Sequence, residues 1–145
     1  MVGLNLVYAD TSALVKLVQN EAESSDLRKW LSQHQPLIAT SDLTTTEILR
    51  ACRTSAPEAV LEVTQMLTKF VRIPLSRSLC HSAGVSVPLP LKSLDALHVA
   101  TAMLLSEEIL GVLTYDRQMI RAAHALGLPT FSPGAVLEEP DRPRN

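Results

Sequence analysis

Residues 4–18 read LNLVYADTSALVKLV. The first six of these positions are mostly apolar and have the character of a β-strand, and Asp10, Thr11 and Ser12 then interrupt the run. The apolar residues that follow, from 13 to 18, recur at helical spacing. This stretch therefore predicts a strand, an abrupt polar turn and a helix.

The same alternation continues along the chain. Strands are expected at 4–9, 36–40, 71–74, 111–114 and 129–132. Helices are expected at 13–18, 24–32, 43–54, 57–70, 76–83, 94–106 and 116–126, with a loop at 84–91 and a Ser93 cap on the helix after it. Short apolar strands that alternate with helices are typical of a parallel sheet covered on both faces. The predicted fold class is α/β.

The composition fits a single domain. In 145 residues, 46% are hydrophobic and 19% charged, which is enough apolar material for one core. We expect this domain to span 1–134. Residues 135–145 are charged and contain prolines, so we expect them to fray.

Several classes of protein are disfavoured by composition. A net charge of −2 and 3% aromatic residues do not suit a passive nucleic-acid binder. Cys52 and Cys80 lie far apart, which argues against a zinc knuckle or a disulfide framework. The apolar start of the chain has no basic leading region, and no run is long enough to span a membrane. We therefore expect a cytoplasmic protein that does not bind membranes.

Four acidic residues stand at informative places. Asp10 ends the first expected strand, Asp116 follows the fourth, and Asp95 lies in the first turn of the helix at 94–106. An aspartate at such a position can be explained as a helix cap or by the helix dipole. Glu47 cannot be explained in this way, because it lies well inside the helix at 43–54.

A parallel sheet brings the ends of its strands to one edge, so these acids are expected to gather there. At an effective dielectric constant of about 20, two unit charges about 5 Å apart repel by roughly 3 kcal/mol. Protonation or a divalent cation has to relieve this repulsion. Oxygen ligands without cysteine or clustered histidine favour Mg²⁺ or Mn²⁺ over zinc.

The stretches around these acids resemble the four acidic motifs of PIN-domain ribonucleases, and in particular the VapC-type toxins of type II toxin–antitoxin pairs. The motifs are YADTSA at 8–13, TEILR at 46–50, LDALHVATA at 94–102 and LTYDR at 113–117. Each motif alone is weak, but the four occur in the family's order and spacing over nearly the whole chain.

The resemblance implies a single domain with a five-stranded, mainly parallel sheet and a Mg²⁺-dependent (or Mn²⁺-dependent) endoribonuclease activity. Its implied partners are an RNA substrate, a second copy in a homodimer and a VapB-like antitoxin that inhibits it. Carried onto this chain, the catalytic and metal-binding residues are Asp10, Glu47, Asp95 and Asp116. The family places its metal chiefly on the first and third of these acids. Thr11, Ser12 and Thr114 would support the site.

Four features keep two interpretations each. Arg50 lies one helical turn after Glu47 and either pairs with it or binds a substrate phosphate. Asp42 is either a helix cap or an outer ligand of the metal. His98 is either a packed core residue, which we favour, or a base. The irregular segment 78–91 either borders the substrate cleft or is a plain connection.

Three other functions are compatible with an α/β chain. An aspartyl-phosphate phosphatase usually carries a D-x-D motif after its first strand, whereas position 12 is serine here. A receiver domain needs an aspartate at a strand end in mid-chain, and the chain has Leu75, Ser76 and Arg77 there. A non-catalytic interaction module on the PIN fold is the remaining alternative, which the complete set of four acids disfavours.

Overall fold

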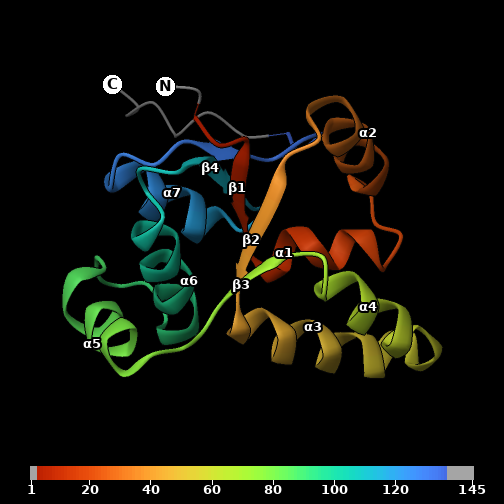
Figure 1. The fold of residues 1–145 in the computed structure, drawn as a ribbon, viewed down its shortest axis with the longest axis horizontal. Coiled ribbons are helices and arrows are strands. Elements are labelled where there is room, and N and C mark those ends of the chain that lie inside the picture. Colours follow the sequence, from red (N-terminus) through yellow and green to blue (C-terminus); the bar gives the residue numbers. More distant parts are fainter. Residues whose placement is uncertain (1–2, 137–145) are drawn as a thin grey trace, which may run out of the picture.

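The structure, a computed structural model, describes residues 3–136. Its centre is a five-stranded sheet in which all neighbouring strands are parallel (Figure 1). The strands are β1 (Leu6–Ala9), β2 (Leu37–Ser41), β3 (Val71–Ile73), β4 (Ile109–Leu113) and β5 (Thr130–Phe131), in the order β3-β2-β1-β4-β5. The predicted α/β class and parallel sheet are confirmed. Residues 137–145 of the expected tail lie outside the described range.

Helices cover both faces of this sheet. They are α1 (Thr11–Leu14), the 3₁₀ turn η1 (Val15–Leu17), α2 (Ser24–His34), α3 (Asp42–Ser55), the 3₁₀ turn η2 (Pro57–Ala59), α4 (Val60–Leu67), α5 (Arg77–Ser86), α6 (Ser93–Leu104) and α7 (Arg117–Ala125). In Figure 1, α1 to α4 lie on one side of the strands and α5 to α7 on the other. None of the helices within residues 3–136 is both long and apolar enough to span a bilayer.

Strand β1 joins the two halves of the core. All four of its residues are buried, as expected for a central strand covered on both faces. Because successive side chains of a strand point to opposite faces, Val7 packs with the cluster beneath α1, α3 and α4. Tyr8 packs on the other face with Ala102 of α6 and Ala123 of α7.

The strand order reverses at β1. The chain runs from β1 to β2 and β3 on one side, then crosses to β4 and β5 on the other. Ligands in such sheets bind outside the carboxyl ends of the strands at this reversal. Asp10, the residue directly after β1, lies at this point.

Several expected element boundaries differ from the structure. The helix expected at 13–18 is α1, which begins at Thr11 and ends at Leu14, followed by the 3₁₀ turn η1. Helix α5 does not stop before Gly84 but continues to Ser86, because one glycine weakens a helix by only about 1 kcal/mol without breaking it. The helix ends where Val87, which precedes Pro88, adopts an extended conformation. The single helix expected at 57–70 is instead η2 followed by α4, which ends at Leu67.

Helix caps also differ in part from expectation. Lys92, not Ser93, is the cap residue of α6, and no side chain caps this helix. At α3 the Ser41 side chain accepts a hydrogen bond from the Leu43 N–H, so Ser41 is the cap and Asp42 is an exposed residue of the first turn. The expectation that Asp42 caps α3 is therefore wrong.

Candidate active site

Asp10 is a buried carboxylate held by three donors. It caps α1 and is 3% exposed. Its Oδ1 accepts hydrogen bonds from Ser12 Oγ at 2.6 Å and from the Ala13 N–H at 3.2 Å, and its Oδ2 accepts from Thr114 Oγ1 at 2.6 Å. Burial nevertheless raises the pKa of Asp10, and these hydrogen bonds only partly oppose the increase. Burial therefore outweighs the hydrogen bonds that the carboxylate accepts.

The turn after β1 is bonded to the end of β4. The Tyr115 N–H donates to Ser12 Oγ at 2.9 Å, and the Asp116 N–H donates to Thr114 Oγ1 at 3.1 Å. Asp116 itself caps α7, since its Oδ1 accepts from the backbone N–H groups of the helix start. The sequence predicts three supporting side chains, and all three form hydrogen bonds to candidate site residues: Ser12 and Thr114 bond Asp10, and Thr11 bonds Glu47.

Glu47 projects from α3 and is tied to two other segments. Its Oε1 accepts hydrogen bonds from Thr11 Oγ1 and from His98 Nε2, each at 2.7 Å. The side chain is 29% exposed. Burial on its own raises the pKa of Glu47, but the hydrogen bonds from His98 and Thr11 outweigh burial and hold the pKa below its ordinary value. Glu47 is therefore a carboxylate at neutral pH.

His98 and Tyr8 also belong to the site, although the sequence indicates the link between them only weakly. His98 is buried at 3% exposure, as the packing interpretation predicts. Its ring also bonds on both sides, because Nε2 contacts Glu47 and Nδ1 lies 2.7 Å from the Tyr8 hydroxyl. Two sequence features point weakly to this link. His98 follows Asp95 by one helical turn, and Tyr8 is the single aromatic residue of β1.

Asp95 lies in the first turn of α6 and is half-buried. Burial raises its pKa first, and the nearby charges of Asp116 and Glu47 raise it further, against smaller opposing effects of His98 and Lys92. The charges of three candidate acids therefore act on one another at this edge of the sheet.

The kind of ligand atoms in the site fits a hard divalent cation. The candidate side chains are, however, farther apart than the ligands of a bound metal ion. Within residues 3–136, no three His, Cys, Asp or Glu side chains are close enough together to hold a metal ion. The candidate ligands are all carboxylates; burial raises the pKa of Asp10, and burial followed by the charges of Asp116 and Glu47 raises that of Asp95. Oxygen donors of this kind suit Mg²⁺ or Mn²⁺.

In the part of the chain that the structure describes, Arg50 forms no ion pair with Glu47. It is exposed and, with Arg53 and Thr54, lines a shallow hollow of about 260 Å³ on α3. The structure therefore does not support the pairing of Arg50 with Glu47, and its contact with a substrate phosphate stays a prediction.

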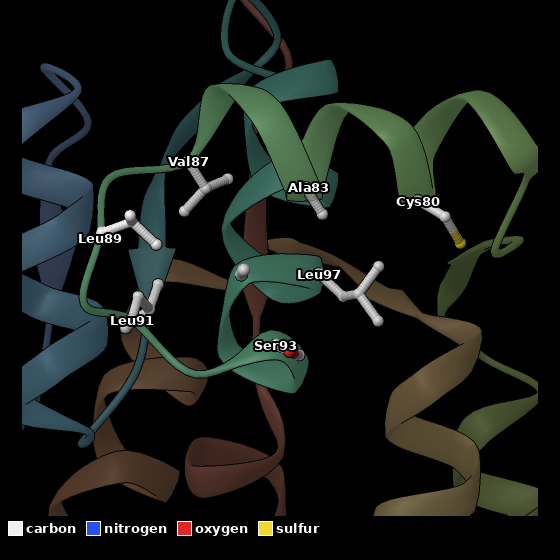
Figure 2. A pocket seen from close by; sticks show the side chains of 9 residues that line it. Cys80, Ala83, Val87, Leu89, Leu91, Ser93 and Leu97 are labelled. Carbon is white, nitrogen blue, oxygen red and sulfur yellow. The ribbon is translucent and has the colours of Figure 1, made fainter.

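A second hollow, of about 310 Å³, lies between α5 and the start of α6 (Figure 2). Val87, Leu89 and Leu91 line it from the connecting segment, and Leu97 lines it from α6. Asp95 is not among its lining residues. The hollow is thus an apolar neighbour of the acidic edge and not part of it.

Comparison with known proteins decides the family. A sequence model of the PIN domain matches residues 7–125. The chain belongs to the PIN-domain family. This match confirms the resemblance drawn from the four acidic motifs.

Curated relatives align with this PIN domain over almost their whole length. Ribonuclease VapC35 of Mycobacterium tuberculosis (strain CDC 1551 / Oshkosh) is 38% identical over 133 residues, and the alignment covers 89% of this chain and 98% of the relative. Ribonuclease VapC47 of the same strain is 34% identical over 135 residues, and the alignment covers 90% of this chain and 99% of the relative.

Solved structures share the fold. A chain of a toxin–antitoxin complex from Klebsiella pneumoniae superposes with a TM-score of 0.67 at 21% identity, and the superposition covers 90% of this chain and 99% of that chain. VapC20 of Mycobacterium tuberculosis, described as a Sarcin-Ricin loop cleaving toxin, superposes with a TM-score of 0.69 at 17% identity. The superposition covers 88% of this chain and 99% of VapC20. At these identities the likeness concerns the fold alone.

Proposed function

We propose that this PIN domain is a metal-dependent endoribonuclease and the toxin of a toxin–antitoxin pair. The observation that carries the proposal is its alignment, over nearly full length, with proteins named Ribonuclease VapC. The burial of the Asp10 carboxylate and the repulsion that Asp116 and Glu47 exert on Asp95 support it, because a bound cation would relieve both.

In this proposal Asp10 and Asp95 are the main ligands of Mg²⁺ or Mn²⁺, with Asp116 and Glu47 bound directly or through water. When bound, the cation would supply positive charge for a phosphodiester oxygen and lower the pKa of a water molecule. Ser12 and Thr114 keep the Asp10 carboxylate in one orientation through their 2.6 Å hydrogen bonds.

The reaction is hydrolysis of a phosphodiester bond. The oxygen of water attacks phosphorus in line, and the bond from phosphorus to the 3′ oxygen breaks. The 3′ oxygen takes up a proton, so the products are a 5′-phosphate and a 3′-hydroxyl. Arg50 is proposed to hold a neighbouring phosphate, which suits its place one turn beyond Glu47.

The proposed partners are an RNA substrate, a VapB-like antitoxin and a second copy of the chain. Support for the antitoxin comes from the structural neighbour solved as a toxin–antitoxin complex. The homodimer rests on the family resemblance alone.

A cleavage assay tests the activity. Purified protein is incubated with labelled RNAs with and without EDTA, beside Asp10→Asn and Asp95→Asn. We expect cleavage by the wild type with Mn²⁺, and a loss of at least about 100-fold with chelator or with either substitution, because oriented ligands of a catalytic metal are needed together.

A measurement without substrate accompanies this assay. Mn²⁺ that binds only the folded protein should raise the melting temperature of the wild type, and less so that of Asp95→Asn. Cleavage that persists in EDTA would refute the metal mechanism. A wild type that cuts none of a broad set of RNAs would favour the non-catalytic interaction module.

A further inference from the structure

A chain of hydrogen bonds runs through the candidate site and links four segments. It starts at the Tyr8 hydroxyl on β1, passes through both nitrogens of His98 on α6, reaches Oε1 of Glu47 on α3 and ends at the Thr11 hydroxyl on α1. Each of its three hydrogen bonds measures 2.7 Å. The residues it joins lie 36 to 90 positions apart in sequence, so no local element accounts for it.

The donors and acceptors fix the direction of this chain. Oε1 of Glu47 also accepts from Thr11, and a carboxylate oxygen can only accept, so Nε2 of His98 is the donor in the 2.7 Å contact with Glu47. With its proton on Nε2, the ring can accept at Nδ1 from the Tyr8 hydroxyl 2.7 Å away, so both contacts are satisfied.

The two donors to Glu47 belong to the neighbourhoods of two other acids. Thr11 directly follows Asp10, and His98 lies one turn after Asp95 on α6. Both donors bond the same oxygen, Oε1, which leaves Oε2 as the oxygen of Glu47 free to take a ligand. The position of this carboxylate is thus coupled to both neighbouring motifs.

We propose that His98, held by Tyr8, is a positioning residue that orients Glu47 toward the metal and the substrate phosphate. The inference rests on the proposed nuclease function and adds two residues to its site. His98 acts through Glu47 and touches no reacting atom. A buried histidine needs an acceptor for its N–H in any case, so the positioning role and a role in packing alone are separated by experiment.

A pair of amide substitutions separates these two roles. In His98→Gln the side-chain N–H₂ can reach the place of Nε2 and still donate to Glu47. In His98→Asn the amide matches the place of Nδ1, so the donor to Glu47 is lost. Both variants put an uncharged amide in the same buried place. His81→Gln, at an exposed position of α5, serves as the control for a histidine outside the site.

Two quantities are measured for each variant: kcat on RNA, and the dissociation constant of Mn²⁺ without RNA, by calorimetry. We expect His98→Asn to lose about tenfold or more in kcat and in Mn²⁺ affinity, as is usual for residues that orient metal ligands. His98→Gln should keep both within about threefold of the wild type. Tyr8→Phe should fall between these variants, and His81→Gln should match the wild type.

A third measurement does not depend on activity. The ¹⁵N signals of His98 in the metal-free protein should show the proton on Nε2, and Tyr8→Phe should disturb this preference. A proton on Nδ1 in the wild type would overturn the proposal. So would equal losses in His98→Gln and His98→Asn that follow their melting temperatures, or no loss in either. A wild type that neither cuts RNA nor binds Mn²⁺ would instead refute the nuclease function.

Discussion

Thr114 does two things with one hydroxyl. It donates to Oδ2 of the buried Asp10, and it accepts from the backbone N–H of Asp116. Its own side chain is fully buried, so no water replaces these bonds if the hydroxyl is removed. A hydrogen bond to a buried charged group contributes about 1.5 to 3 kcal/mol.

Thr114→Val keeps the shape of the side chain and removes these two hydrogen bonds together with a 3.3 Å contact between the Thr114 hydroxyl and Ser12 Oγ. We expect the free energy of unfolding at neutral pH to fall by about 2 kcal/mol, measured by urea denaturation. The matched variant Thr114→Ser keeps the hydroxyl and removes only a methyl group, so it should lose about 1 kcal/mol. Equal losses in the two variants would show that the hydroxyl does not stabilise Asp10.

Two glycines in different elements show how backbone surroundings decide the effect of one methyl group. A Cβ on Gly111 in β4 would lie 2.7 Å from the carbonyl oxygen of Pro129 and 2.7 Å from the Phe131 ring. A Cβ on Gly84 in α5 would meet nothing within 4 Å. The first glycine thus permits β5 to approach β4, whereas the second only weakens its helix.

Gly111→Ala and Gly84→Ala should therefore change stability in opposite directions. We expect Gly111→Ala to destabilise the fold by about 1 to 3 kcal/mol, because the carbonyl of Pro129 cannot move aside without breaking its bond to Val112. Gly84→Ala should stabilise it by about 0.5 to 1 kcal/mol. Thermal melts of the two variants test this. A stabilising Gly111→Ala would contradict the close approach of β5.

At the scale of the whole molecule, the uncompensated Asp10 makes stability depend on pH. Its pKa in the folded protein is raised above the ordinary 3.8, so the protonated form is favoured by folding. That contribution is fully present below pH 3.8 and is lost as the pH rises through the raised pKa.

In EDTA, Asp10→Asn should therefore melt higher than the wild type at neutral pH, and the gap should narrow as the pH falls toward 4. A gap of about 1 kcal/mol corresponds to roughly 4 °C. Added Mn²⁺ should raise the melting temperature of the wild type but not of Asp10→Asn. A gap that does not change with pH would mean that ionised Asp10 carries no burial cost.

The sequence predicts the layout of the fold well because each strand is a short apolar run closed by polar residues. Asp10 illustrates this, since one residue ends β1, caps α1 and marks the reversal point of the sheet. The boundaries of α5 were predicted less well, because the cost of Gly84 inside a helix is small enough for tertiary packing to overcome.

The hydrogen-bond chain through Tyr8, His98 and Glu47 could not be predicted in the same way. Periodicity reports which face of an element is buried, but it does not report which side chains meet across two elements. Tyr8 and His98 are 90 residues apart, and either one alone reads as an ordinary core residue.

The central place of β1 has a consequence for how the protein is made. Thr114, which bonds Asp10, emerges from the ribosome 104 residues after it, and β4 is needed to complete one side of β1. A nascent chain whose synthesis has not yet reached β4 lacks both this strand and Thr114. An RNA-cutting site assembled in this order would stay inert on its own ribosome until translation is nearly finished.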